Sequence, residues 1–125
     1  MKRIINTPNA PAPIGPYSQA VMIDNTLYTS GQIAINPETN ELEIDDIKSE
    51  TKLVMENLKA LLTEAEMDFS NVIKCSIFIT DMNNFAQINE VYGTYFTSDF
   101  PARETVEVAC LPKNVNVEIS AIAVK

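Results

Sequence analysis

The chain has 125 residues, of which 46% are hydrophobic and 21% charged, so we expect a single domain spanning residues 1–125. A formal net charge of −8, with nine basic residues, argues against a partner that is a nucleic acid or an anionic membrane surface. The sequence has no histidine, which excludes Ser-His-Asp and Cys-His catalysis and His-based zinc sites, and its two cysteines are too few for a cysteine-only zinc site.

The first third of the chain predicts an N-terminal strand at about residues 2–6, a proline-rich extended arm at 7–16 and a β-hairpin. Residues 18–23 and 27–32 favour strand, and Asp24-Asn25 between them is a turn signal. A loop follows over the Asn-Pro-Glu-Thr-Asn segment.

The middle of the chain predicts an amphipathic helix whose N-cap is Asp45 or Asp46. Its apolar face recurs every three or four residues, at Ile47, Thr51, Val54, Leu58, Leu61 and Ala65. Residues 71–80 favour strand and end in Asp81, a good N-cap for a second helix. One side of that helix is expected to carry Phe85, Ile88, Val91, Tyr92, Tyr95 and Phe96.

Strands at 103–109 and 115–124 complete the order β-β-β-α-β-α-β-β, which predicts an α+β sandwich with both helices on one face of the sheet. The other face would mix charged groups with apolar groups such as Phe78 and Ile122. A solvated sheet face normally alternates more cleanly, so we expect this face to contact another subunit. Alternation also groups Arg103 with Thr105 and Glu107, and Glu118 with Ser120 and Ile122.

The location indicated by the sequence is cytoplasmic. No segment approaches the roughly 18 apolar residues needed to cross a bilayer. Polar residues follow the N-terminal apolar residues directly, so a signal peptide is not expected. Cys75 lies in an apolar run, and we expect it and Cys110 to be reduced thiols.

Four residues are candidates for chemistry, each with a plainer alternative. Arg103 opens a strand and could bind a carboxylate, or form a surface ion pair with a neighbouring glutamate. Glu118 in an apolar strand could activate a water, or face solvent. Asn89 could bind a ligand or make an ordinary structural hydrogen bond, and Tyr17 could close a pocket or be a packed aromatic.

As a set, these residues stand in segments that resemble the RidA (YjgF/YER057c/UK114) family. The resemblance covers essentially the whole chain, with Pro101-Ala102-Arg103 as its most recognisable part. Asp81-Met82 and Leu111-Pro112-Lys113 also fit. The main matching stretches are Ile14-Gly15-Pro16-Tyr17-Ser18-Gln19-Ala20, Thr29-Ser30-Gly31-Gln32, Asn89-Glu90-Val91-Tyr92 and Pro101-Ala102-Arg103-Glu104-Thr105-Val106-Glu107-Val108-Ala109.

The resemblance implies a chorismate-mutase-like α+β subunit and a homotrimer with sites between subunits. It also implies hydrolysis of 2-iminobutanoate and 2-iminopropanoate to 2-oxo acids and ammonia, without cofactor or metal. Arg103 would bind the substrate carboxylate and Glu118 would hold the attacking water. The remaining lining residues would be Tyr17, Ser30, Gly31, Asn89 and, through its backbone, Thr105.

Three positions depart from the common family pattern. Many members read Arg-Ser-Cys at Arg103-Glu104-Thr105, an arginine at Cys110 and a second glutamate at Ser120. We expect these changes to alter rim charge and interface contacts and to leave the chemistry intact. The alternative function is a small-ligand-binding, regulatory or chaperone-like trimer. Some family members are proposed to be ribonucleases, but the acidic charge argues against RNA cleavage here.

Overall fold

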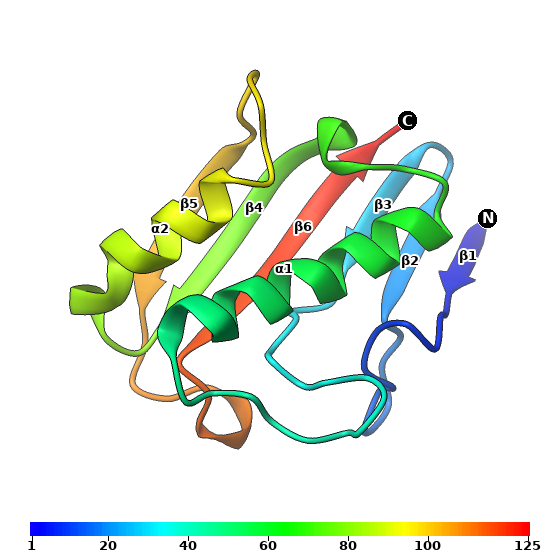
Figure 1. Cartoon of the computed structure of the whole chain (residues 1–125). Coiled ribbons are helices and arrows are strands. Elements are labelled where there is room, and N and C mark those ends of the chain that lie inside the picture. The colour runs from blue at the N-terminus through cyan, green and yellow to red at the C-terminus, as the bar shows by residue number, and fades with distance from the viewer.

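A computed structural model describes residues 1–125 as one mixed six-stranded sheet with two α-helices on one of its faces (Figure 1). The strand order is β1-β2-β3-β6-β4-β5, and only the β4–β5 pair is parallel. The strands are β1 (Lys2–Ile5), β2 (Ala20–Ile23), β3 (Thr26–Thr29), β4 (Val72–Ile79), β5 (Ala102–Glu107) and β6 (Val117–Val124). The helices are α1 (Ile47–Glu64) and α2 (Phe85–Gly93). The predicted α+β class and one-sided helix placement are therefore confirmed.

Helix α1 forms as its sequence predicts. Asp46 is the N-cap, and its carboxylate accepts a hydrogen bond from the Ser49 amide at 2.9 Å. The predicted apolar face from Thr51 onward is fully buried against the sheet. Burying side chains such as Leu58 and Leu61 contributes about 1.5–3 kcal/mol each, so this face anchors the helix on β6.

The second helix is shorter than predicted at both ends. Asp81 caps a 3-10 turn, η2 (Met82–Asn84), and α2 begins only at Phe85. After Gly93 the chain continues with i to i−3 backbone bonds, including that from the Tyr95 amide to the Tyr92 carbonyl at 3.2 Å. Tyr95 and Phe96 therefore lie outside the helix, although both still pack on the core.

The predicted hairpin is present, but its strands end before residue 30. Asp24 takes a left-handed φ of 51° at the turn, as a turn asparagine or aspartate commonly does. Beyond Thr29 the chain leaves β6 and returns only at Gln32, which makes an isolated bridge to Ile119. The intervening Ser30-Gly31 segment bends away from regular pairing, and this bend matters for the site.

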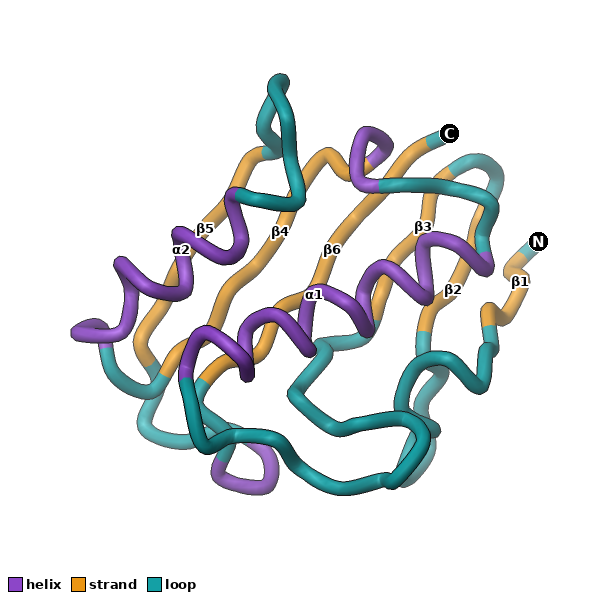
Figure 2. Tube along the Cα trace, in the orientation of Figure 1, coloured by secondary structure: helices purple, strands orange, loops and turns teal.

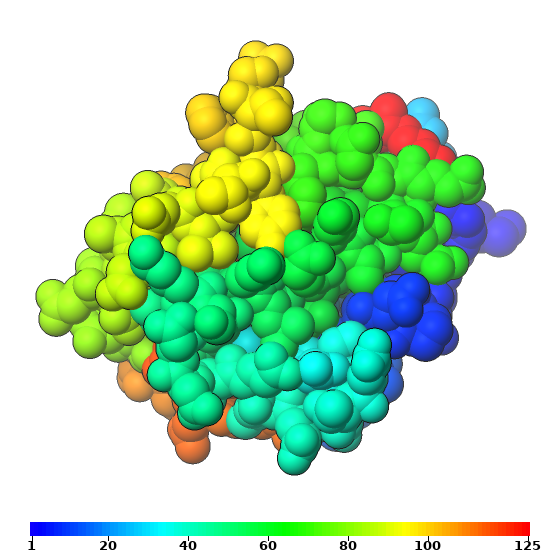
Figure 3. All heavy atoms as spheres, in the orientation of Figure 1, coloured from blue at the N-terminus to red at the C-terminus, as the bar shows by residue number.

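The face of the sheet opposite the helices is uncovered, as predicted (Figures 1 and 2). It carries Lys74 and Glu104, whose charged atoms lie 3.0 Å apart, beside apolar groups. Tyr28 is 48% exposed and Val106 43% exposed on this face. Side chains of the two helices cover much of the other face, and the loop at residues 97–100 projects past the edge of the molecule at the top of the view (Figure 3). Contact with another subunit stays a prediction.

Cys75 is buried and Cys110 exposed, and neither forms a disulfide. None of the helices combines the length and the hydropathy that a membrane span requires.

Candidate active site

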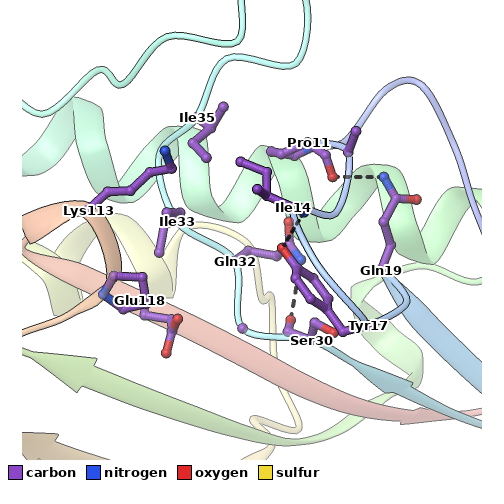
Figure 4. Close-up of a pocket in the computed structure, with 13 residues that line it drawn as sticks. Pro11, Ile14, Tyr17, Gln19, Ser30, Gln32, Ile33, Ile35, Lys113 and Glu118 are labelled. Atoms are coloured by element: carbon purple, nitrogen blue, oxygen red, sulfur yellow. Dashed lines mark hydrogen bonds between the residues drawn. The ribbon is translucent and has the colours of Figure 1, made fainter.

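A pocket of about 490 Å³ lies beside the bend at Ser30-Gly31 (Figure 4). Strand β6 contributes Glu118 to one side, and the segment that directly follows the proline-rich arm contributes Tyr17 to the other. The lining residues that matter for its chemistry are Tyr17, Ser30, Gly31, Gln32, Lys113 and Glu118. The structure therefore brings together four of the seven predicted site residues.

At the bend, the Glu118 side chain lies close to the backbone. A Cβ atom at Gly31 would lie 2.7 Å from the carboxyl carbon of Glu118, so any other residue there would displace the Glu118 side chain. Ser30 is held on the opposite side, where its hydroxyl donates to the Ser18 carbonyl at 2.6 Å. The Gly31 backbone thus forms a floor directly against the Glu118 carboxylate.

Gln19, which the sequence analysis did not single out, holds the arm over the pocket. Its side chain is 2% exposed and accepts from the Thr7 amide at 2.7 Å. Its amide nitrogen donates to carbonyls of Thr7, Ala10 and Pro11. The available signal was its position inside the Gly-Pro-Tyr-Ser-Gln stretch. Tyr17 is 53% exposed at the pocket mouth and is therefore not packed into the core of its own chain.

Glu118 lies half-buried on the face of the sheet away from the helices. Its neighbours in the strand, Val117 and Ile119, are fully buried under α1, and its cross-strand partner is Phe78. Burial raises the pKa of the Glu118 carboxyl above its ordinary value. No charged group contributes to that raised pKa: Tyr17 and Lys113 are the other titratable groups of the pocket.

Arg103 lies at the start of the edge strand β5, on the helix side of the sheet. Its guanidinium carbon is 5.4 Å from the Phe85 ring centroid and 5.2 Å from that of Tyr92. One of its nitrogens donates to the Asn89 side-chain oxygen at 2.6 Å. Two aromatic rings and an amide therefore hold the guanidinium in place.

Arg103 has no carboxylate partner, which contradicts the surface ion-pair alternative. The neighbouring Glu104 pairs with Lys74, and the Glu107 carboxylate accepts from the Met82 amide at 2.7 Å. The remaining guanidinium donors are therefore free for an external anion.

Thr105 shares the helix side of β5 with Arg103, because their β4 partners Ile77 and Cys75 are both buried there. The Thr105 hydroxyl and the Tyr92 hydroxyl are buried without a hydrogen-bond partner. Burial raises the pKa of Tyr92, so its hydroxyl stays neutral beside Arg103.

Arg103 and Glu118 do not meet within one chain. Arg103 pairs with Cys75 and Glu118 with Phe78, so they lie on opposite faces of the sheet with β4 between their strands. Two inter-strand spacings separate their backbones by about 10 Å across the sheet. The seven predicted residues thus form two clusters: Tyr17, Ser30, Gly31 and Glu118 at the pocket, and Asn89, Arg103 and Thr105 at the β5 edge.

The chain contains no group of three His, Cys, Asp or Glu side chains that could hold a metal ion.

A second residue that sequence reasoning missed is Lys113, at the pocket rim. Its amino group points away from Glu118 (Figure 4). It takes part in neither of the two ion pairs of the chain.

Comparisons with known proteins show the family to which the chain belongs. The family model described as endoribonuclease L-PSP matches residues 7–125. A 2-iminobutanoate/2-iminopropanoate deaminase of Dermatophagoides farinae is 51% identical over 98% of this chain and 96% of its own length. A protein of unknown function from the conserved Rid family of Yersinia pestis superposes with a TM-score of 0.98, at 48% identity and full coverage of both chains.

A third relative was solved with a small molecule. Escherichia coli TdcF with bound serine superposes with a TM-score of 0.95, at 44% identity and 98% coverage of each chain. Sequence, family model and fold agree over almost the entire length, and the chain belongs to the RidA (YjgF) family.

Proposed function

We propose that the protein hydrolyses reactive 2-imino acids, such as 2-iminobutanoate and 2-iminopropanoate, to 2-oxo acids and ammonia. The observation that carries this proposal is Arg103, an arginine fixed by Asn89 and two aromatic rings, yet without an acidic partner. A planar fork of free donors matches the carboxylate of a small acid. The deaminase name of a relative 51% identical supports the reaction.

A second copy of the chain would complete the site. Glu118 and Arg103 face opposite sides of the sheet, whereas a 2-imino acid is only a few ångströms long. Since β5 is an edge strand, the pocket of a neighbouring copy can approach Arg103. We therefore propose a closed homotrimer with three equivalent sites, each taking its carboxylate clamp and its acid–base group from different copies.

The proposed reaction begins when Arg103 binds the substrate carboxylate and a water lies against Glu118. Glu118 accepts a proton as the water oxygen bonds to the carbon of the nitrogen-protonated imine, and the resulting tetrahedral intermediate carries an amino and a hydroxyl group. Glu118 then returns this proton to the amino nitrogen, so that the carbon–nitrogen bond breaks and ammonia leaves, and the hydroxyl proton passes to the Glu118 carboxylate to give the 2-oxo acid. A raised pKa suits Glu118 to both accept and return a proton.

The other site residues would orient the substrate. Tyr17, Ser30 and Gly31 would line the pocket, Asn89 would hold the guanidinium, and Thr105 would offer its backbone. An imine is already electrophilic, especially when its nitrogen is protonated. Positioning of this kind can supply several kcal/mol of the barrier reduction. The proposed steps need only side chains, backbone and water.

The test is to generate 2-iminobutanoate from threonine with a pyridoxal-phosphate dehydratase and to follow its decay. Arg103→Ala should lower hydrolysis on the order of a hundredfold or more, since two charge-assisted hydrogen bonds are worth roughly 1.5–3 kcal/mol each. Arg103→Lys should recover little, because an ammonium lacks the fork. Arg3→Ala, which removes an exposed arginine of β1, is the matched control and should leave the rate unchanged.

The alternative is a ligand-binding, regulatory or chaperone-like trimer without relevant catalysis. A relative of unknown function and a relative with bound serine share this fold, which is compatible with such a role. Folded Arg103→Ala protein that hydrolyses the imine as fast as wild type would favour that alternative. The endoribonuclease description of the family model has less physical support here, since a net charge of −8 opposes binding of a polyanion.

A further inference from the structure

Glu50, in the first turn of α1, is a buried acid that the proposed reaction does not use. Its side chain is 0% exposed and lies on the same buried face as Thr51 and Val54. One carboxylate oxygen accepts from the Asn116 backbone amide at 2.7 Å and from the Val117 amide at 3.3 Å. The other accepts from the Asn116 side-chain amide at 2.8 Å. Neither ion pair of the chain includes Glu50.

Such a group is a poor source of stability. Removing a carboxylate from water is costly, and replacement of buried charges by well-packed apolar residues is often neutral or stabilising. Three well-placed donors make burial of Glu50 tolerable, and they define the position of Asn116 relative to α1 within narrow limits. Glu50 therefore matters for the position of Asn116 relative to α1 rather than for stability.

The segment just before Asn116 needs such a restraint. In the 3-10 turn η3 (Pro112–Asn114), Lys113 and Asn114 have φ values of 56° and 57°, in the left-handed region that side chains disfavour. Two backbone bonds close the turn: Asn114 donates to the Leu111 carbonyl, and Val115 donates to Pro112. Residues in this region persist where the surroundings over-determine them.

This restrained corner forms part of the pocket. Pro112 and Lys113 line the wall on one side of Asn116, and Glu118 lies two residues after it. The Asn116 carbonyl also accepts from the Thr80 amide at 3.2 Å, which ties the corner to the end of β4. A shift at Asn116 therefore moves the wall and the Glu118 carboxylate together.

We propose that Glu50 is a positioning residue, which rests on the proposed function: by clamping Asn116 and Val117 it fixes the pocket wall and the place of the Glu118 carboxylate against Gly31. It touches no substrate. Its removal acts through Glu118, so it lowers the rate of water attack rather than carboxylate binding, which belongs to Arg103 on the other face of the sheet.

The experiment uses two single variants, Glu50→Gln and Asn116→Ala, and one double variant. In Glu50→Gln the new amide nitrogen faces the Asn116 side-chain donor, so that bond is lost. Combining Glu50→Gln with Asn116→Asp exchanges donor and acceptor and restores it. Glu64→Gln makes the same substitution at an exposed glutamate of α1 and is the control.

Each single variant should lower kcat about tenfold or more, with KM changed by no more than about threefold, because small misplacements of reacting groups have large rate effects. The acidic limb of the pH–rate profile should move to lower pH, since a loosened corner admits water and relieves the burial that raises the pKa of Glu118. The double variant should regain most of kcat and the wild-type pH profile. Glu64→Gln should match wild type throughout.

Folded single variants with wild-type kcat and pH profile would overturn the proposal. So would a loss of kcat that follows melting temperature alone while the pH limb stays fixed. If Glu50→Gln does not fold, Asn116→Ala decides the matter.

The same question has an answer without catalysis. An NMR titration of the Glu118 carboxyl carbon should show its pKa lowered in Asn116→Ala and unchanged in Glu64→Gln. An unshifted titration in Asn116→Ala would overturn the positioning role. If wild type hydrolyses imine no faster than Arg103→Ala, the proposed reaction fails, and this titration still decides the role of Glu50.

Discussion

The guanidinium of Arg103 and the carboxylate of Glu118 have contrasting surroundings. Arg103 lies on the helix side of the sheet between Phe85 and Tyr92 and donates to Asn89. Glu118 lies on the other side against the backbone of Gly31, and burial alone accounts for its raised pKa. The Arg103 guanidinium is held in place by its neighbours, whereas the Glu118 carboxylate is half-buried without a positively charged partner.

The difference separates two tasks. A group that binds an anion benefits from a fixed orientation, because a preorganised fork loses little entropy when the ligand arrives. A group that transfers protons benefits from free lone pairs and a pKa moved toward working pH. The contrast predicts which property each substitution will change, and the predictions below test it.

The largest expected effect is on Glu118. Glu118→Gln should lower kcat by roughly 10²–10⁴-fold, the usual contribution of general acid–base catalysis. KM should change little, because Arg103 still binds the carboxylate. Steady-state assays with freshly generated 2-iminobutanoate measure both constants, with Glu64→Gln as control. If Glu118→Gln raises KM and keeps kcat, Glu118 takes part in binding, and the proposed division of tasks between Arg103 and Glu118 is wrong.

A mixing experiment tests whether two chains share one site. Arg103→Ala and Glu118→Gln should each be nearly inactive, but oligomers assembled from an equal mixture should regain activity. Random assembly leaves both groups intact at about one quarter of sites if each site draws Arg103 and Glu118 from different copies. Mixing without joint reassembly is the control and should regain nothing. Inactive co-assembled mixtures, shown by mass to be mixed trimers, would contradict the shared site.

A smaller effect is expected at Lys113, the unpaired cation of the pocket rim. Lys113→Ala should lower kcat/KM by about two- to fivefold, and the loss should shrink as salt rises, because an exposed cation attracts an anionic substrate over a distance set by screening. Lys125→Ala, at the C-terminus, is the control. A salt-independent loss would point instead to a direct contact between Lys113 and the bound substrate.

Local sequence patterns predicted much of the secondary structure of this molecule. The Asp46 cap and the apolar face of α1 follow from short-range rules, and both form as predicted. The alternation that grouped Arg103 with Thr105, and separated each from its neighbour in the strand, also holds. The end of α2 was placed too late, because Tyr95 and Phe96 keep an apolar spacing while the backbone changes to 3-10 bonds.

The arrangement of residues that lie far apart in the chain was harder to predict from the sequence. Alternation cannot say which face of the sheet each group takes, because that depends on pairing between distant strands, so the separation of Arg103 from Glu118 emerged only with the register. The close approach of Glu118 to Gly31 likewise joins residues that lie far apart along the chain. Glu50 did leave a local signal, since it falls three residues after Ile47 on a buried stripe.

The smallest effect concerns stability. Burial raises the folded-state pKa of Glu118 above that of the unfolded chain. Below the unfolded pKa both states are protonated and ionisation plays no part. As pH rises, the unfolded carboxyl loses its proton first, so ionisation favours the unfolded chain and the penalty is complete above the folded pKa.

Glu118→Gln removes this penalty while nearly preserving shape. At pH 7–8 the variant should melt at a higher temperature than wild type, and this gain should disappear as the pH falls below about 4. Calorimetry at matched protein concentration measures this, since association shifts melting temperatures. Glu64→Gln, at an exposed position, should show no such pH-dependent gain. If Glu118→Gln melts below wild type at neutral pH, the carboxylate stabilises the assembled protein. Glu118 would then have a favourable partner in the assembly, contrary to the description above.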